Sequence, residues 1–282
     1  MIIWLSSYPK SGNTWVRSLI ASILYSEDGT HSFKNMNKIK QYPLRNQFKN
    51  LISNFHDINQ IKKNWILSQD EINLDQKIKL FKTHHVNCKL GTDAFTNLNN
   101  TLGVIYIVRD PRNIISSIKN HYSLDNYEKA KKMLFTKNQA IGTNPNENKE
   151  KNFLTLIGSW GTHYNSWKNT KKNFLLIRYE DLIINTEKEL RRIIEYLKIF
   201  FKINVSDEKI IKAINTTSFN SLKNMEKKGL FKENAFDKKT GERKNFFNLG
   251  PNNNWHKLLD KKIAKEIEEK FKNEMKELGY IN

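Results

Sequence analysis

The amino-acid sequence predicts an α/β fold with a central parallel sheet flanked by helices. Strand-like and helix-like segments alternate along the chain, which is the pattern of consecutive βαβ units. The run Val104–Val108 is continuously apolar, as is typical of a strand buried on both faces. The 282 residues contain neither an internal repeat nor a long Pro/Gly/Ser linker, so we expect one domain over residues 1–282.

Apolar runs and helical periodicity place the elements along the chain. Four runs are expected to form strands, namely residues 2–5, 79–83, 104–108 and 174–178. Residues 13–25 are expected to form a helix, because their apolar side chains recur at helical spacing. Asp110 and Pro111 are typical of a helix start, and Thr186 and Glu189 have the spacing of a capping box.

Three segments lack clear periodicity, and long irregular segments of this kind are often lids or binding loops. They are residues 31–77, 123–152 and 224–254. Ordinary surface loops are the alternative. We expect the substrate side of any active site to be built from residues 31–77, 123–152 and 224–247 of these segments.

The charge of the chain bears on its partners. The formal net charge is +19 at pH 7, with 48 Lys and Arg against 29 Asp and Glu. Most of these basic residues are lysines spread along the whole chain, with no Arg-rich tract, so we expect a solvated surface and no nucleic-acid partner. Such a surplus still attracts a ligand with several negative charges.

The cysteine content and hydropathy indicate where the protein works. Cys88 is the single cysteine, which permits no internal disulfide. The N-terminal residues lack the pattern of a secretion signal, and no apolar run approaches the roughly 20 residues of a membrane span. We therefore expect a cytoplasmic protein without a membrane span.

The first motif with chemical content follows the first predicted strand. It reads Tyr8-Pro9-Lys10-Ser11-Gly12-Asn13-Thr14-Trp15 and leads directly into the first predicted helix. Backbone N–H groups at such a strand-to-helix turn form an anion site, and a lysine with several hydroxyls suits a phosphate or sulfate. The order differs from the nucleoside-triphosphatase loop, because Lys10 precedes Gly12.

Two further motifs follow predicted strands. Arg109, at the end of 104–108, is suited to bidentate contact with a phosphate, and Ser117 lies two helical turns beyond it. An ion pair with Asp110 is the structural alternative for Arg109. Lys82-Thr83-His84 stands at the end of 79–83, where ligands bind in open α/β sheets. A neutral imidazole there is a candidate general base, and chemistry alone allows His84 or His85.

Together these runs resemble the sulfotransferases of the cytosolic type and their bacterial relatives, which use 3′-phosphoadenosine-5′-phosphosulfate (PAPS). The resemblance covers about 250 residues in order, from Ile2 to Trp255. It implies a P-loop nucleotide-kinase-like α/β fold. It also implies a 5′-phosphosulfate loop, whose residues are Lys10, Ser11, Gly12, Asn13 and Thr14.

The same resemblance assigns the remaining roles. Trp15 would stack on the adenine, and Arg109 and Ser117 would hold the 3′-phosphate. Its register selects His84 as the general base, with Lys82 and Lys10 as catalytic cations. Weaker matches add Tyr179, Thr217 and Phe219 around the adenine.

The C-terminal match departs from the family pattern. Asn248, Leu249 and Gly250 align with the start of an Arg-Lys-Gly-x-x-Gly-Asp-Trp loop that ends at Trp255. Asn248 stands where the family has Arg, and Asn253 stands where it has Gly. Because an asparagine brings no charge, we expect the 3′-phosphate to be bound more weakly, or to be bound by Arg243 or Lys244 instead.

The resemblance implies transfer of a sulfuryl group from PAPS to a hydroxyl or amine, with 3′-phosphoadenosine-5′-phosphate (PAP) as the product. The acceptor would be a small molecule or a glycan, and the oligomeric state stays open. We expect no metal, because the chain shows no carboxylate cluster or Cys/His ligand spacing. Three alternatives stay open: a P-loop-type nucleotide kinase, a nucleic-acid-binding protein, and a degenerate relative that binds PAPS or PAP without catalysis.

Overall fold

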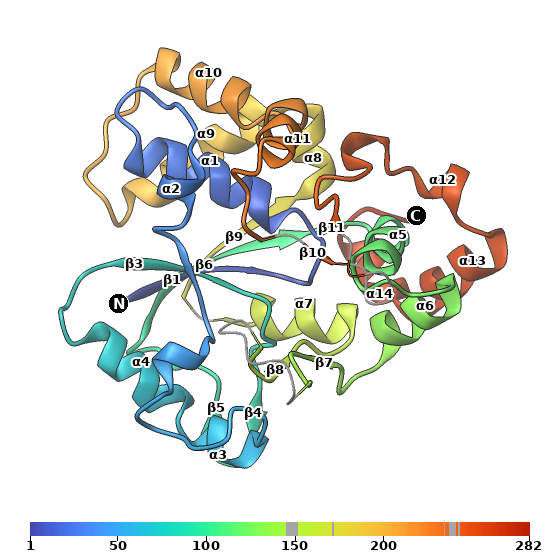
Figure 1. Cartoon of the computed structure of the whole chain (residues 1–282), viewed down its shortest axis with the longest axis horizontal. Coiled ribbons are helices and arrows are strands. Elements are labelled where there is room, and N and C mark those ends of the chain that lie inside the picture. Colours follow the sequence, from blue (N-terminus) through green and yellow to red (C-terminus); the bar gives the residue numbers. More distant parts are fainter. Residues whose placement is uncertain (145–151, 171, 234, 237–240, 242) are drawn as a thin grey trace. The chain divides into compact units, whose positions relative to one another are not determined.

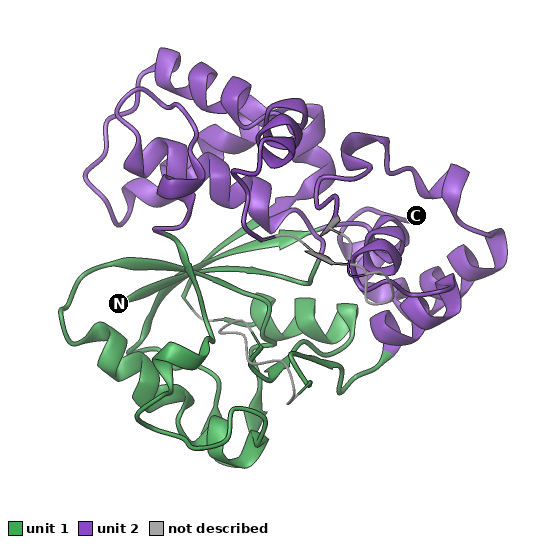
Figure 2. Cartoon of the chain, viewed as in Figure 1, with its two compact units in different colours: residues 1–9, 39–108, 136–176 green, residues 10–38, 109–135, 177–282 purple. Residues whose placement is uncertain are grey.

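The structure is a computed structural model, and it describes all residues except 145–151, 171, 234, 237–240 and 242. The chain forms two compact units, each assembled from separated stretches of sequence (Figure 2). Unit 1 contains residues 1–9, 39–108 and 136–176, and unit 2 contains residues 10–38, 109–135 and 177–282.

A five-stranded sheet organises unit 1, and its strand order is β2-β3-β1-β6-β9 (Figure 1). Its strands are β1 (Ile2–Ser7), β2 (Lys40–Gln41), β3 (Lys79–Thr83), β6 (Thr101–Val108) and β9 (Asn173–Arg178). The pairs β2–β3, β1–β3 and β1–β6 are all parallel. The expected parallel α/β fold is therefore confirmed.

Parallel pairing brings the carboxyl ends of β1, β3 and β6 to one edge of the sheet. Ser6 of β1 is level with Thr83 of β3 and with Tyr106 of β6. Each of these three strands is followed along the chain by one of the motifs found in the sequence. The topology thus explains why chemically active residues recur directly after strands.

The other elements of unit 1 are short. They are η1 (Arg45–Gln47), α3 (Ile58–Lys63), α4 (Trp65–Asn73), α7 (Trp160–Lys168) and the two-residue strands β4 (Lys89–Leu90), β5 (Asp93–Ala94), β7 (Ala140–Ile141) and β8 (Thr155–Leu156). Helix α7 packs against β1 and β6.

Unit 2 is mainly helical. Its longer helices are α1 (Asn13–Tyr25), α5 (Pro111–His121), α6 (Tyr127–Phe135), α9 (Thr186–Lys198), α10 (Asp207–Thr216), α11 (Phe219–Lys227) and α13 (Lys261–Lys270). The short elements are α2 (Phe33–Met36), α8 (Tyr179–Ile184), β10 (Ala235–Phe236), β11 (Arg243–Lys244), η2 (Gly250–Asn252), α12 (Trp255–Leu258) and α14 (Lys272–Glu277). Within this unit α1 packs on α2, α9 and α10, and α5 packs on α6, α12 and α13.

Most local expectations from the sequence are met. The helix over 13–25 has the expected bounds, and the Asp110 side chain accepts the Arg112 N–H at the start of α5. The capping box was wrong, because α9 begins one residue earlier than that box requires. Its cap is Asn185, which accepts from the Lys188 N–H, while the Thr186 hydroxyl donates to the Leu182 carbonyl.

The segments without periodicity contain more regular structure than expected. Residues 31–77 include α2, α3 and α4, residues 123–152 include α6, and residues 224–254 include β10 and β11. These elements are short, and several contribute few buried side chains, so no apolar stripe marks them in the sequence.

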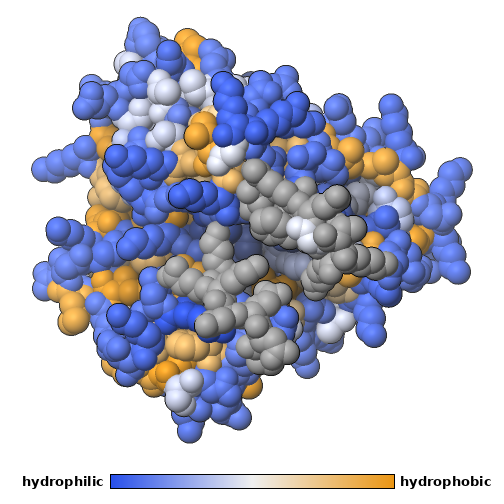
Figure 3. Space-filling model, viewed as in Figure 1, coloured by the Kyte–Doolittle hydropathy of each residue, from blue (hydrophilic) through white to orange (hydrophobic). Residues whose placement is uncertain are grey.

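The surface is mostly hydrophilic, in agreement with a mean hydropathy of −0.68. Hydrophilic side chains cover most of the face seen in Figure 3, with smaller apolar areas between them. Within the described part of the chain, every helix is too short or too polar to span a bilayer.

Trp4 is a central packing residue of unit 1. Its ring is fully buried, with centroids 5.4 Å from Tyr42, 5.6 Å from Phe95 and 6.1 Å from Trp167. Its indole N–H donates to the Thr101 hydroxyl at 3.0 Å, which satisfies the polar atom inside the core.

Trp4→Ala should therefore lower the free energy of unfolding by about 3–5 kcal/mol, because it leaves a large cavity in the core. Urea unfolding followed by circular dichroism measures this. Leu74→Ala is the control: that side chain is 79% exposed, so its removal should change stability by less than about 0.5 kcal/mol. Equal losses in the two variants would contradict this account of the core.

Candidate functional site

The turn before α1 depends on a glycine. Gly12 has a φ of +99° and occupies the N-cap position of α1, with no side chain capping the helix. A Cβ built on Gly12 would lie 2.4 Å from Cδ2 of Tyr179, so no other residue fits without moving that ring. The backbone end of α1 is thereby presented without a side-chain cap, as an anion site requires.

Lys10 links this turn to two other parts of unit 2. It has a φ of +71°, which is strained for a residue with a side chain, and such strain is concentrated at functional sites. Its ammonium lies 4.0 Å from the centroid of the Phe246 ring. Nη1 of Arg109 donates to the Lys10 carbonyl at 3.3 Å. The two predicted anion motifs are therefore in direct contact.

Arg109 is buried, with only 6% of its surface exposed. Its guanidinium lies 4.2 Å from the centroid of the Tyr179 ring, and its Nε finds no hydrogen-bond partner among the described residues. The buried Ser11 hydroxyl is in the same situation. Buried donors without partners are costly, so this set of residues suits a ligand that carries several anionic oxygens.

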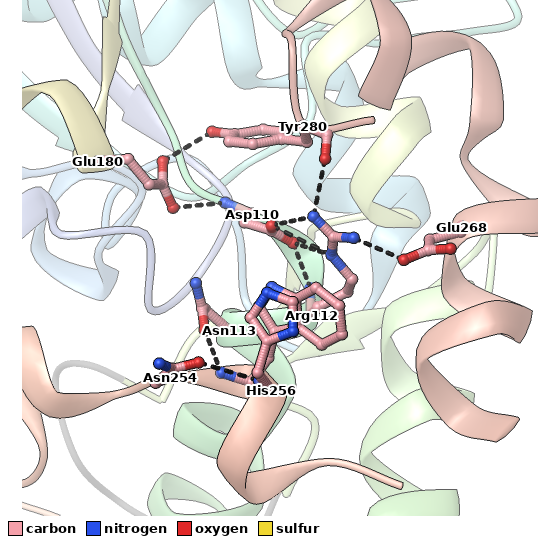
Figure 4. Close-up of polar contacts among 9 residues, drawn as sticks. Asp110, Arg112, Asn113, Glu180, Asn254, His256, Glu268 and Tyr280 are labelled. Atoms are coloured by element: carbon pink, nitrogen blue, oxygen red, sulfur yellow. Dashed lines mark hydrogen bonds and ion pairs between the residues drawn. The ribbon is translucent and has the colours of Figure 1, made fainter. Parts of the chain in front are cut away.

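Arg109 makes no ion pair with Asp110, which was the structural alternative. Asp110 pairs instead with Arg112, at 2.6 Å. Arg112 also contacts the Glu268 carboxylate at 2.5 Å and donates to the Tyr280 carbonyl at 2.9 Å (Figure 4). With both charges of the Asp110–Arg112 pair used internally, Arg109 keeps its charge for a ligand.

Glu180 also supports the turn at Asp110, through hydrogen bonds to its carboxylate. Its carboxylate accepts the backbone N–H of Asp110 at 3.0 Å and the hydroxyl of Tyr280 at 2.9 Å (Figure 4). Burial raises the pKa of Glu180 and raises the pKa of Tyr280 well above its usual value. Sequence reasoning missed Glu180, Glu268 and Tyr280 as supports of this turn, because nothing local marks contacts across 70 or more residues.

The aromatic residues assigned to the adenine are partly brought together. Trp15 and Tyr179 meet edge to face, with ring centroids 5.8 Å apart. A Cβ on Gly250 would lie 2.3 Å from the Phe219 ring, so Phe219 packs directly on the C-terminal loop. Thr217 is fully buried, and its hydroxyl donates to the Ala213 carbonyl at 2.7 Å. That proton is thus used within α10.

The C-terminal loop is held from α11. The buried Glu226 carboxylate accepts the N–H groups of Phe246 and Phe247 at 2.6 and 3.0 Å. Asn248 follows and is exposed, so its amide is open to solvent. Leu249 precedes η2, which begins at Gly250.

Lys244 and Arg243 are the two cations suggested to compensate for Asn248. Lys244 donates to the Ser123 hydroxyl at 2.9 Å and to the Asn120 carbonyl at 3.4 Å, so its ammonium lies beside the C-terminal end of α5. The side chain of Arg243 lies outside the described part of the structure. Compensation by either residue stays a prediction.

The candidate base His84 belongs to unit 1, where it follows β3. Its Nδ1 lies 2.7 Å from the carbonyl oxygen of Ser7. A carbonyl only accepts, so Nδ1 carries the proton and the neutral ring keeps its lone pair on Nε2. The half-buried imidazole is therefore held in the tautomer that a base acting through Nε2 needs. Lys82, two residues earlier, is 8% exposed.

His85 is a packing residue, unlike the half-buried His84. It is fully buried, stacks on Phe95 with centroids 4.1 Å apart, and its Nδ1 lies 2.6 Å from the Val86 carbonyl. Burial lowers the pKa of His85 to about 3. A fully enclosed ring cannot reach an acceptor, so the geometry favours His84.

His163, on α7, supports the backbone of His84. Its Nε2 lies 3.1 Å from the His84 carbonyl and must donate, so its Nδ1 accepts from the Tyr106 hydroxyl at 2.8 Å. Burial lowers the pKa of His163 to about 3. No sequence signal marks this residue, because a lone histidine in a helix has no recognisable pattern.

The described residues contain no group of three or more His, Cys, Asp or Glu side chains placed to hold a metal ion. The nucleotide-binding candidates from Lys10 to Trp15, with Arg109, Ser117, Tyr179, Phe219 and Gly250, all belong to unit 2. Lys82 and His84 belong to unit 1.

Comparison with known protein families identifies the family of this chain. The model of the sulfotransferase domain matches residues 2–279. The chain belongs to the sulfotransferase family. That assignment rests on nearly the whole chain and agrees with the resemblance seen in the motifs.

Individual sulfotransferases are similar at low identity. Dog sulfotransferase 1B1 is 26% identical over 78% of this chain and 66% of that protein, so this chain spans slightly less than two thirds of it. Cytosolic sulfotransferase 12 of Arabidopsis thaliana is 25% identical over 96% of this chain and 77% of that protein.

Solved structures share the fold. Mouse sulfotransferase SULT7A1, complexed with PAP, has a TM-score of 0.59 at 22% identity, covering 97% of this chain and 84% of that one. Retinol dehydratase, in a complex with retinol and PAP, has a TM-score of 0.60 at 19% identity, covering 98% and 81%. The α/β fold with its parallel sheet is thus the fold of these proteins.

Three buried histidines, His31, His85 and His163, predict how stability depends on pH. Burial lowers the pKa of His31 to about 4, as it lowers the pKa of the other two to about 3, so below the ordinary value of 6.5 the unfolded chain takes up a proton on each of them that the folded protein does not bind. The free energy of unfolding should therefore fall as pH drops from 7 to 5, by roughly 2 kcal/mol for each histidine. Urea unfolding at pH 7, 6 and 5 measures the slope.

His163→Gln removes one of these groups while keeping an N–H donor for the His84 carbonyl. Its stability should depend less steeply on pH than that of the wild type. An unchanged slope in this variant would show that His163 is not a source of the acid sensitivity.

Proposed function

We propose that this chain transfers the sulfuryl group of PAPS to a hydroxyl or amine of a small-molecule or glycan acceptor, releasing PAP. The observation that carries the proposal is the contact between Arg109 and Lys10 in unit 2. It joins two buried cation-bearing turns, and a ligand with phosphates at two separated positions can use both. The match of the sulfotransferase model over residues 2–279 supports the same reaction.

In this proposal unit 2 binds the nucleotide. Lys10 and the backbone end of α1, from Ser11 to Thr14, take the 5′-phosphosulfate, and Arg109 with Ser117 takes the 3′-phosphate. Trp15, Tyr179, Thr217 and Phe219 surround the adenine, and Asn248, Leu249 and Gly250 close on the 3′ side. Support comes from the buried, unpartnered Nε of Arg109 and from the absence of room for any side chain on Gly12.

The chemical step is an in-line displacement at sulfur. The acceptor oxygen or nitrogen forms a bond to sulfur while the bond from sulfur to the 5′-phosphate oxygen breaks. The acceptor proton goes to Nε2 of His84, whose tautomer is set by the Ser7 carbonyl. Lys82 and Lys10 stabilise the negative charge that develops on the non-bridging and leaving oxygens.

Other features belong to the same proposal. We propose that residues 1–282 act as one sulfotransferase domain. A cytoplasmic location agrees with the single cysteine and with the names of the cytosolic relatives. The acceptor class rests on the polar character of residues 31–77 and 123–152.

Isothermal titration calorimetry with PAP, ATP and AMP tests the nucleotide assignment. PAP should bind in the low micromolar range and more tightly than AMP, because only PAP engages both cationic turns. ATP should bind more weakly than PAP, since it lacks a 3′-phosphate. Equal or tighter binding of ATP would favour a nucleotide kinase on the same sheet and contradict the proposal.

His84→Ala tests the chemical step. Loss of a general base should lower kcat by roughly 10²–10⁴-fold, while the affinity for PAP stays unchanged. Single-turnover assays with PAPS and a panel of phenolic, alcoholic and amine acceptors measure the rate. Near-normal turnover in this variant would remove His84 from the mechanism, and binding of PAP without turnover by the wild-type protein would indicate a degenerate relative.

A further inference from the structure

The residue that stands out in unit 2 is Asn253, which lies between η2 and α12. The family pattern has Gly at this position, so a side chain here is a feature of this chain. Asn253 is 6% exposed, whereas its neighbours Asn252 and Asn254 are exposed. The nitrogen of this buried amide has hydrogen-bond partners, whereas its Oδ1 finds none among the described residues.

The partners of Asn253 lie on α5. Its Nδ2 donates to the Asn113 carbonyl at 2.8 Å and to the Ser117 hydroxyl at 3.2 Å. The carbonyl can only accept, which fixes the NH₂ group of the amide on this side. The second hydrogen of the same NH₂ therefore points at Ser117 Oγ, which accepts it.

This arrangement determines what the Ser117 hydroxyl can do. A helical serine often donates to the carbonyl four residues earlier, which here is Asn113. That carbonyl already accepts a backbone N–H within α5, and Asn253 takes its second lone pair. With the Asn113 carbonyl filled, the proton of Ser117 is available for another acceptor.

The loop that carries Asn253 is anchored independently of this amide. The Trp255 N–H donates to Asn113 Oδ1 at 2.9 Å, and the Arg112 guanidinium lies 4.1 Å from the centroid of the Trp255 ring. Figure 4 shows Asn113 and Arg112 beside this loop. Removal of the Asn253 side chain should therefore leave the loop on α5 and affect Ser117 specifically.

We propose that Asn253 is a positioning residue for the nucleotide 3′-phosphate, acting by orienting the Ser117 hydroxyl so that it donates to a phosphate oxygen. The inference rests on the proposed function, which places the 3′-phosphate at Arg109 and Ser117. It gives a physical role to one departure of the C-terminal loop from the family pattern. An oriented neutral donor offsets part of the contact that Asn248, in place of Arg, does not supply.

The test compares PAP with AMP, because the two ligands differ only in the 3′-phosphate. Calorimetry on the full chain gives the ratio of AMP to PAP dissociation constants for the wild type, Asn253→Ala, Ser117→Ala and the double variant. Asn253→Ala should lower this ratio roughly tenfold, the effect of one hydrogen bond to a charged group, while AMP affinity stays unchanged. The double variant should match Ser117→Ala, because Asn253 acts through that hydroxyl.

Asn252→Ala is the matched control, since it removes an exposed asparagine from the same loop and should leave the ratio unchanged. Thermal unfolding reports whether each variant folds, and Asn253→Gly, the residue of the family pattern, replaces Asn253→Ala if that variant does not. An unchanged ratio in the folded variant, equal weakening of both ligands, or additive effects in the double variant would overturn the inference. A wild-type protein that does not prefer PAP over AMP would instead overturn the proposed function.

Discussion

The close approach of Gly12 to the Tyr179 ring is the constraint on which the two cationic turns of unit 2 depend. No Cβ fits between them, and the backbone at Gly12 has a positive φ that side chains disfavour. This geometry lets the first turn lie against α8 and leaves the start of α1 without a side-chain cap. It also allows the ring of Tyr179 to cover the guanidinium of Arg109, so one contact organises both cationic turns.

A second constraint is electrostatic. Two arginines lie close together in sequence, and both are buried, but their charges are used differently. Arg112 is neutralised by Asp110 and Glu268, and breaking such a buried pair is costly. The Tyr280 carbonyl and the Glu180 carboxylate complete the support of this turn. Arg109 can remain uncompensated in the described structure because its neighbour has already satisfied the nearby carboxylate.

The sequence was sufficient wherever a feature is local. The helix 13–25 and the strands around residues 79–83 and 104–108 were found because apolar spacing reports burial directly. The capping box failed because Asn185, one residue earlier, is an equally good cap, and such alternatives are decided by how the chain enters the helix. The short helices of residues 31–77 gave little signal because few of their side chains are buried.

The sequence by itself determined the parallel α/β fold, the order of the candidate motifs and the family, because each of these follows from contiguous runs of residues. Tertiary structure alone decided which of two adjacent histidines is enclosed, which arginine is neutralised and why Asn253 is buried. Those outcomes depend on partners far away in the chain, such as Glu268 for Arg112 and Ser117 for Asn253, 156 and 136 residues apart. In such cases the role of a side chain depends on the atoms that pack against it. Local sequence patterns do not identify those atoms, because they come from distant parts of the chain.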